Sequence, residues 1–288
     1  MGGDAARGPS GPIRSFRDIS IPNFPSVHKG IFALQLFLAA APAEVREASR
    51  FTRSLVHVAY RIGPSSSLMR HDLLLDTRGG LLSISDLDAG FIAAPEQLAA
   101  AVVRECGRRN FGGVVLDFEA SPTPDRRKFA QTLGQMLGGR RTLFVPETYS
   151  VPGAVTLVNT AVSGGSFSEY LSEARSKYGR IALDLQRLTM DFVLPAHTGQ
   201  GKPLSPAQFQ ALRQEQSPAV FFSPDLCARY FTCIRGRETH FVLFDDADTL
   251  LRKVRIGSSM GIGAGFLMYP EVADLLPRLF PGKGGKQN

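Results

Sequence analysis

The segment "FGGVVLDFEAS", residues 111–121, is an apolar run that ends in two carboxylates. The stretch from Phe111 to Leu116 has the composition of a strand that is buried on both faces. Asp117 and Glu119 follow, two residues apart, and because side chains alternate along a strand they point to the same side. The segment predicts a buried strand with a polar site at its carboxyl end. Capping or ion-paired carboxylates at a strand end would also fit.

Similar apolar runs recur along the chain, and most are continuous rather than alternating, as in parallel strands covered on both faces. The eight predicted strands are 31–38, 55–62, 81–85, 113–118, 142–145, 155–162, 181–185 and 265–269. Between them, the segments 95–110, 125–137 and 246–261 have the apolar spacing of helices. Eight strands alternating with helices favour a closed α/β barrel, the (β/α)8 TIM barrel, over an open doubly wound sheet.

Two segments depart from this alternation. Only "SVPGA" separates the fifth and sixth strands, so one helix is missing or one strand is misplaced. Residues 217–246 read as a small antiparallel β-rich insertion, with "RGRE" as its turn. We therefore expect a flexible tail over 1–28, a barrel over 29–278 and a C-terminal tail over 279–288.

The composition is that of an ordinary soluble globular protein, with 43% apolar and 20% charged residues. The net charge of +7 is scattered in short basic pairs, which is typical of a solvated surface, and no nucleic-acid motif is present. The three cysteines have no metal-binding spacing and suit a reducing compartment. We expect no metal and no cofactor, and the composition leaves the oligomeric state open.

The segment "GIFALQLFLAAAPA" after Lys29 has two interpretations. It resembles the core of a signal peptide, but it lies deep in the chain and is too short to span a membrane. The strand count favours the alternative, in which it forms the first barrel strand and is retained. Without a convincing signal peptide, the location stays open between the cytoplasm and a spore or cell wall.

The fourth strand resembles the glycoside hydrolase family 18, the chitinase-type barrels, and most of all the branch of spore-cortex N-acetylglucosaminidases. The family motif at this position is Asp-x-x-Asp-x-Asp-x-Glu, and Asp117 and Glu119 match its last two acidic residues. The segment "CARYFTCIRGRETHFVLFDDADTLLRKVRIGSSMGIGAGFLMY" resembles the insertion, last helix and last strand of that branch. The similarity runs loosely over about residues 30–275.

The resemblance implies a hydrolase of β-linked glycans that contain N-acetylglucosamine, such as peptidoglycan or chitin. Glu119 would be the general acid, and Asp117 would support the substrate's acetamido group as it attacks the anomeric carbon, a departure from the usual two-carboxylate scheme. Such an acid must be protonated near neutral pH, so its pKa must be raised by an apolar wall or a neighbouring charge. Tyr269 would take the place of the family's last-strand tryptophan.

Several motif positions differ from the family. Gly112 and Val115 replace the first two acidic residues, and Asn159-Thr160 is the nearest equivalent of the Tyr-Asp pair at the sixth strand. A degenerate barrel that binds a glycan or a protein without cleaving it is therefore the alternative to an enzyme. Three further carboxylates could rebuild a polar, substrate-binding site, and they are Glu147, Asp184 and Asp191.

Overall fold

The computed structural model describes residues 34–71, 77–196 and 200–281. The predicted N-terminal tail and residues 31–33 of the first predicted strand lie outside the described residues. Within the described residues, no helix is long and apolar enough to cross a membrane.

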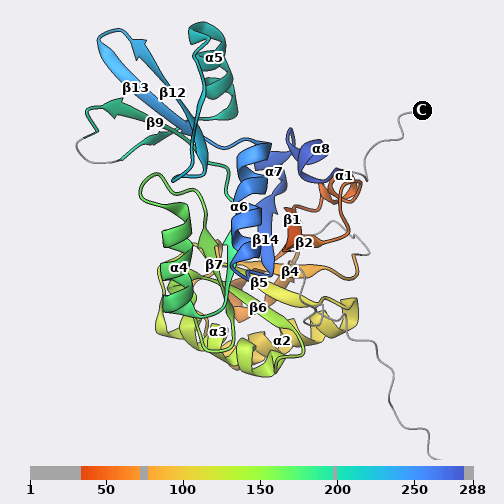
Figure 1. The fold of residues 1–288 in the computed structure, drawn as a ribbon. Coiled ribbons are helices and arrows are strands. Elements are labelled where there is room, and N and C mark those ends of the chain that lie inside the picture. Colours follow the sequence, from red (N-terminus) through yellow and green to blue (C-terminus); the bar gives the residue numbers. More distant parts are fainter. Residues whose placement is uncertain (1–33, 72–76, 197–199, 282–288) are drawn as a thin grey trace, which may run out of the picture. The chain divides into compact units, whose positions relative to one another are not determined.

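Eight parallel strands form a closed barrel (Figure 1). In chain order they are β1 (Gln35–Ala40), β2 (Leu55–Ile62), β4 (Leu81–Ser85), β5 (Gly113–Asp117), β6 (Thr142–Pro146), β7 (Val155–Asn159), β8 (Ile181–Asp184) and β14 (Ala264–Met268). The ring closes because β1 pairs with both β14 and β2. The predicted (β/α)8 fold is confirmed, and each predicted strand overlaps one of these eight.

The inside of the barrel is filled by apolar side chains that alternate along the strands. This interior cluster consists of Ala39, Val56, Leu81, Val115, Phe144, Val155, Ala182, Ala264 and Phe266, and it is buried. The residues between them face outward, toward the helices. Because the interior is packed, a ligand can reach only the ends of the barrel. At the carboxyl ends of the strands, the first inward-facing residues beyond the interior cluster line the candidate site.

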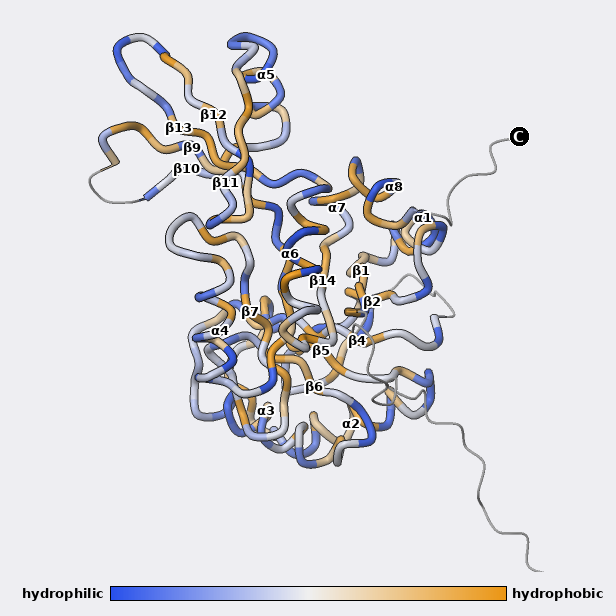
Figure 2. The backbone as a smooth tube through the Cα atoms, in the orientation of Figure 1, coloured by the Kyte–Doolittle hydropathy of each residue, from blue (hydrophilic) through white to orange (hydrophobic). Residues whose placement is uncertain are grey.

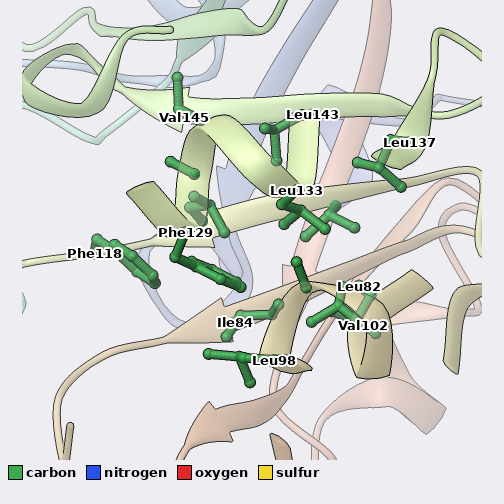
Figure 3. Packing of buried hydrophobic residues seen from close by; sticks show 14 of the residues in the cluster. Leu82, Ile84, Leu98, Val102, Phe118, Phe129, Leu133, Leu137, Leu143 and Val145 are labelled. Atoms are coloured by element: carbon green, nitrogen blue, oxygen red, sulfur yellow. The ribbon is translucent and has the colours of Figure 1, made fainter. Parts of the chain in front are cut away.

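Helices cover the outside of the barrel. They are α2 (Pro95–Arg109), α3 (Pro124–Leu137), α4 (Phe167–Tyr178) and α6 (Ala247–Ser259), with short α1 (Val45–Ala48), α7 (Tyr269–Val272) and α8 (Leu276–Leu279). Figure 3 shows Leu98 and Val102 of α2 and Phe129 and Leu133 of α3 packed with outward-facing strand residues. In Figure 2 the apolar segments follow the barrel strands, in agreement with their burial on both sides.

In the part of the chain that the structure describes, two of the connections between barrel strands show no α-helix. A single 3-10 turn, Glu147–Tyr149, joins β6 to β7, so the predicted gap in the helix pattern is confirmed. Between β2 and β4 the described residues form a 3-10 turn (Pro64–Ser66) and the short antiparallel strand β3 (Leu68–Arg70). Tyr149 fills part of the space of the missing helix, because its buried ring contacts Phe118 and its hydroxyl donates to the carbonyl of Ala120.

A second sheet interrupts the barrel between β8 and α6. Its strands are β9 (Thr189–Leu194), β10 (Lys202–Pro203), β11 (Phe221–Ser223), β12 (Ala228–Arg235) and β13 (Glu238–Phe244), all antiparallel. Helix α5 (Pro206–Gln216) packs on one face through Phe209 and Leu212. The sheet begins at residue 189, ahead of the position 217 at which the sequence predicts the insertion to start. We call residues 189–244 the insertion.

A buried ion pair lies where the chain returns from the insertion to the barrel. Lys253 of α6 donates from Nζ to Asp245 Oδ2 at 2.7 Å and to the carbonyl of Thr160 at 2.9 Å. The other hydrogen bonds of the Asp245 carboxylate come from the backbone N–H of Leu188 and the hydroxyl of Thr249. Because Thr160 follows β7 and Leu188 follows β8, this pair fixes the backbone just beyond two barrel strands.

Candidate active site at the barrel mouth

Asp117 is the last residue of β5 and faces the barrel mouth. Val115, two residues earlier, belongs to the interior cluster, and Leu116 and Phe118 pack in the outer layer. Alternation therefore places Asp117 and Glu119 above the packed interior. Both carboxylates reach solvent. The predicted arrangement of the pair, at the carboxyl end of a buried strand, is present in the structure.

The surroundings of Asp117 raise the pKa of its carboxyl group. The barrel rim displaces much of the water around the Asp117 carboxyl group, and this desolvation is the main cause that raises its pKa. The negative charges of Glu119 and Asp86 raise the pKa of Asp117 further. Asp117 can thus hold a proton at a higher pH than an aspartate in water.

Asp86 supports this pair from the neighbouring strand. It follows β4, its side chain is buried, and its Oδ1 accepts the backbone N–H of Glu119 at 3.0 Å. Its Oδ2 accepts Arg126 Nε of α3 at 2.9 Å. Arg126 thus balances the buried charge of Asp86, and Asp86 fixes the backbone that carries Glu119. The sequence motif does not identify Asp86, although its place directly after the third predicted strand could have pointed to it.

Asp184 approaches the same mouth from the opposite part of the ring. It ends β8, two residues after inward-facing Ala182, and lies level with Asn159 in the β7–β8 pairing. Burial raises the pKa of Asp184 to about 7, with further increases from the nearby charges of Glu271 and Asp117, and a hydrogen bond with Gln186 opposes the shift. Of the three additional carboxylates expected from the sequence, this is the one whose pKa is raised by the charge of Asp117.

The other two carboxylates lie in different environments. Glu147 Oε2 accepts the hydroxyl of Tyr178, at the end of α4, at 2.9 Å. Asp191 belongs to β9 of the insertion and lies 2.9 Å from Nδ1 of the buried His240. Their predicted substrate-binding roles stay predictions.

Tyr269 follows the last barrel strand by one residue. Inward-facing Phe266 and Met268 contact the interior cluster, and Tyr269, next in the chain, contacts the outer cluster around α4 and α6. The stacking role expected for Tyr269 stays a prediction. Met268 occupies the inward-facing place at the end of β14.

A cavity of about 770 Å³ lies between the barrel rim and the insertion. Asn159, Gln186 and Glu271 line it on the barrel side, and Met190 and Phe209 line it on the insertion side. Its lining takes in neither Asp117 nor Glu119, but Asn159 and Gln186 adjoin Asp184. This cavity therefore lies beside the mouth. Its lining residues Gln186 and Glu271 follow β8 and β14, and the sequence motif does not identify them.

Arg187 ties the rim of this cavity together. Its Nη1 donates to the carbonyl of Glu271 at 3.0 Å and to the Asp274 carboxylate at 2.7 Å, and its backbone N–H donates to the Glu271 side chain. These bonds hold α7 against the segment after β8.

Among the described residues no group of three or more His, Cys, Asp or Glu side chains could hold a metal ion.

Comparisons with known proteins show a likeness in fold but not in overall sequence. No family profile matches the chain, and no curated protein matches it. The spore cortex-lytic enzyme SleL of Bacillus cereus superposes with a TM-score of 0.59 at 16% identity, over 88% of this chain and 76% of that one. The chitinase of Chromobacterium violaceum superposes with a TM-score of 0.59 at 15% identity, over 87% and 99% of the two chains.

A third structure is the family GH18 chitinase of Cycas revoluta in complex with allosamidin. It superposes with a TM-score of 0.58 at 14% identity, over 87% of this chain and 99% of that one. These likenesses confirm the resemblance at the level of the fold: the chain has the barrel fold that these cortex-lytic and chitinase structures share. Chemistry must be argued from the site, because one fold hosts many activities.

Proposed function

We propose that this protein is a glycoside hydrolase of β-linked glycans that contain N-acetylglucosamine, such as peptidoglycan or chitin. The observation that carries the proposal is the pair Asp117 and Glu119 at the mouth of a barrel with this fold, with Asp86 fixing the backbone of Glu119. The structures of similar fold include enzymes described as cortex-lytic and as chitinases, which supports the substrate class.

In the proposed reaction, Glu119 gives its proton to the glycosidic oxygen as the bond to the leaving sugar breaks. The carbonyl oxygen of the substrate's own acetamido group attacks the anomeric carbon, so no protein nucleophile is needed. Asp117 accepts a hydrogen bond from the acetamido N–H and stabilises the positive charge that develops on that group. Water then opens the cyclic intermediate, and Glu119 takes up the proton of that water.

A second candidate function is glycan binding without cleavage. Val115 stands where the resembled family has a carboxylate, and it is part of the buried apolar interior beneath Asp117. Asn159 stands at the end of β7, where that family has a Tyr-Asp pair, and its amide is engaged with Gln186 at 2.7 Å. Asp184 and Glu271 are the groups that could replace the missing polar contacts in an active enzyme.

The test is cleavage of chito-oligosaccharides and of peptidoglycan by wild type, Glu119→Gln and Asp117→Asn. Glu119→Gln keeps the shape and removes the transferable proton, so turnover should fall by about 10²–10⁴-fold while binding persists. Asp117→Asn should also slow the reaction, because an amide carries no charge to stabilise the acetamido group. Glu173→Gln, which alters an exposed carboxylate on α4, is the matched control.

The outcomes separate the two functions. Equal cleavage by wild type and Glu119→Gln would refute Glu119 as the general acid. A wild-type protein that binds these glycans and cleaves none of them would establish the binding function in place of the hydrolase.

A further inference from the structure

The segment that follows β5 is fixed at three successive residues by three different parts of the fold. The buried ring of Phe118 packs in the outer layer against α3. The backbone N–H of Glu119 donates to Asp86, which follows β4, at 3.0 Å. The carbonyl of Ala120 accepts the hydroxyl of Tyr149 at 2.8 Å. The exposed side chain of Glu119 therefore projects from a backbone that is held at this residue and on both sides of it.

Asp86 is the one of these three anchors that carries a charge. Its side chain is completely buried, and a carboxylate in that position needs a partner. Arg126 of α3 supplies it, because its Nε donates to Asp86 Oδ2 at 2.9 Å. The rest of the guanidinium donates to the carbonyl of Ala89 at 2.8 Å and to the hydroxyl of Thr123 at 3.3 Å. Asp86 thus has one oxygen fixed by Arg126 and the other by the backbone of Glu119.

Three carboxylates lie close enough to Asp117 to interact with its charge. The negative charges of Glu119, beyond β5, and of Asp86, beyond β4, raise the pKa of Asp117. The charge of Asp117 in turn raises the pKa of Asp184, at the end of β8. Asp86 therefore acts on both members of the candidate pair, on Glu119 through a hydrogen bond and on Asp117 through its charge.

We propose that Asp86, held by Arg126, is a positioning residue that orients Glu119 and sets the pH range of the reaction through its charge on Asp117, an inference that rests on the proposed function. In the proposed reaction Asp117 acts as a carboxylate, so activity falls when Asp117 takes up a proton at low pH. The charge of Asp86 raises the pKa of Asp117 and so moves this acidic limb of the pH profile to higher pH. Removing the charge extends activity to lower pH, whereas removing the hydrogen bond lowers turnover at every pH.

The first measurement needs no turnover. It is a pH titration of Asp117 in the full chain, followed by NMR of its side-chain carboxyl carbon, with Asp117→Asn to assign the signal. Asp86→Asn keeps an oxygen that can accept the N–H of Glu119 and removes the charge, so the pKa of Asp117 should fall. The substitution is also made together with Arg126→Gln, which leaves no unpaired cation in the interior and keeps the test available if the single variant does not fold.

Asp125→Asn is the matched control. Asp125 is a second buried carboxylate beside Arg126, and it accepts a backbone N–H, that of Ile92, at 2.7 Å. Because Asp125 makes this contact away from Glu119, its substitution should leave the titration of Asp117 unchanged.

The second measurement is the pH profile of kcat and KM for cleavage of (GlcNAc)5. Asp86→Asn should move the acidic limb of kcat/KM to lower pH. Asp86→Ala also removes the acceptor for Glu119, so its kcat should lie below that of Asp86→Asn by up to about 10²-fold, with little change in KM. Both variants are compared again in the presence of Arg126→Gln.

Each part of the proposal can fail by itself. An unchanged titration of Asp117 in Asp86→Asn, with and without Arg126→Gln, would refute the role of the Asp86 charge. Equal kcat values for Asp86→Ala and Asp86→Asn would refute the orientation of Glu119 by Asp86. Either result leaves the proposed function standing. If the wild type cleaves no (GlcNAc)5 and no peptidoglycan, the proposed function fails, and the positioning role of Asp86 fails with it.

Discussion

At the scale of single residues, the protonation of Asp184 links the barrel mouth to pH. The pKa of Asp184, about 7, lies above the ordinary value of 3.8, so the folded chain holds this proton more tightly than the unfolded chain. The stabilisation from this proton is complete below the unfolded pKa and is lost as pH rises through about 7. Asp184 therefore makes the fold less stable in mildly alkaline solution than in mildly acidic solution.

Asp184→Asn should remove this dependence, because an amide has no proton to lose. Between about pH 5 and pH 8, we expect the thermal unfolding midpoint of the variant to fall less than that of wild type. At pH 8 the variant should therefore be more stable than wild type. Thermal unfolding at both pH values is the measurement. If wild type and variant show the same change with pH, Asp184 does not titrate in this range.

Some site residues could be predicted from the sequence and others could not. Side chains alternate between the two faces of a strand, so the direction of a residue near a strand end depends on the exact end of that strand. Asp117 is two residues beyond inward-facing Val115, and the motif placed it correctly at the mouth. Glu147 comes one residue after Pro146, in the 3-10 turn that replaces a helix, and it contacts Tyr178. A shift of one residue at a strand end reverses the direction of a side chain, and the apolar pattern does not define the last residue of a strand so closely.

At the scale of elements, the buried ion pair of Asp245 and Lys253 holds the junction of α6, β7 and β8. Removing one partner leaves the other charged and unpaired inside the protein. Lys253→Met should therefore lower the free energy of unfolding by about 3–5 kcal/mol, as measured by denaturant unfolding. It also leaves the carbonyl of Thr160 without its hydrogen bond.

The control for this prediction is an exposed ion pair of the same chemistry. Lys128 and Glu96 lie 2.6 Å apart with side chains that are 59% and 52% exposed. Lys128→Met should leave the denaturant midpoint of unfolding almost unchanged, because water and salt screen an exposed pair. Equal effects of the two lysine substitutions would show that burial does not set the strength of the Lys253 contact.

The predicted strands agree with the structure better than the predicted connections do. Buried parallel strands are continuous apolar runs, a signal that survives in a single sequence. Helix α5 and strand β9 lie in the insertion, where Phe209 and Phe192 pack in small separate clusters. Their pairing partners are distant along the chain, so the start of the insertion depends on tertiary contacts that a local pattern does not contain.

At the scale of the whole molecule, β1 completes the ring. It pairs with β14, the last strand, and with β2, so the barrel closes through a segment that the sequence could also suggest to be a signal-peptide core. A barrel without β1 would have two unpaired strand edges, which are prone to aggregation. The eight-strand count was the argument for the strand interpretation, and the closed pairing agrees with it. The prediction that the segment is retained in the mature protein is separate and awaits N-terminal sequencing.

The three buried cysteines allow local opening of the fold to be measured, because each thiol becomes reactive only when its surroundings open. Cys106 lies on the buried face of α2. Cys227 and Cys233 both belong to the insertion, but Cys227 packs in the cluster around α4 and α6, whereas Cys233 packs in the insertion's own core. Burial raises the pKa of Cys106 and of Cys227 to about 11, so these thiols react with alkylating reagents only when their surroundings open. We expect Cys233 to be alkylated first in native buffer, because the insertion has its own small core, and mass spectrometry of peptides would give the three rates. One common rate would mean that insertion and barrel open only as a single cooperative unit.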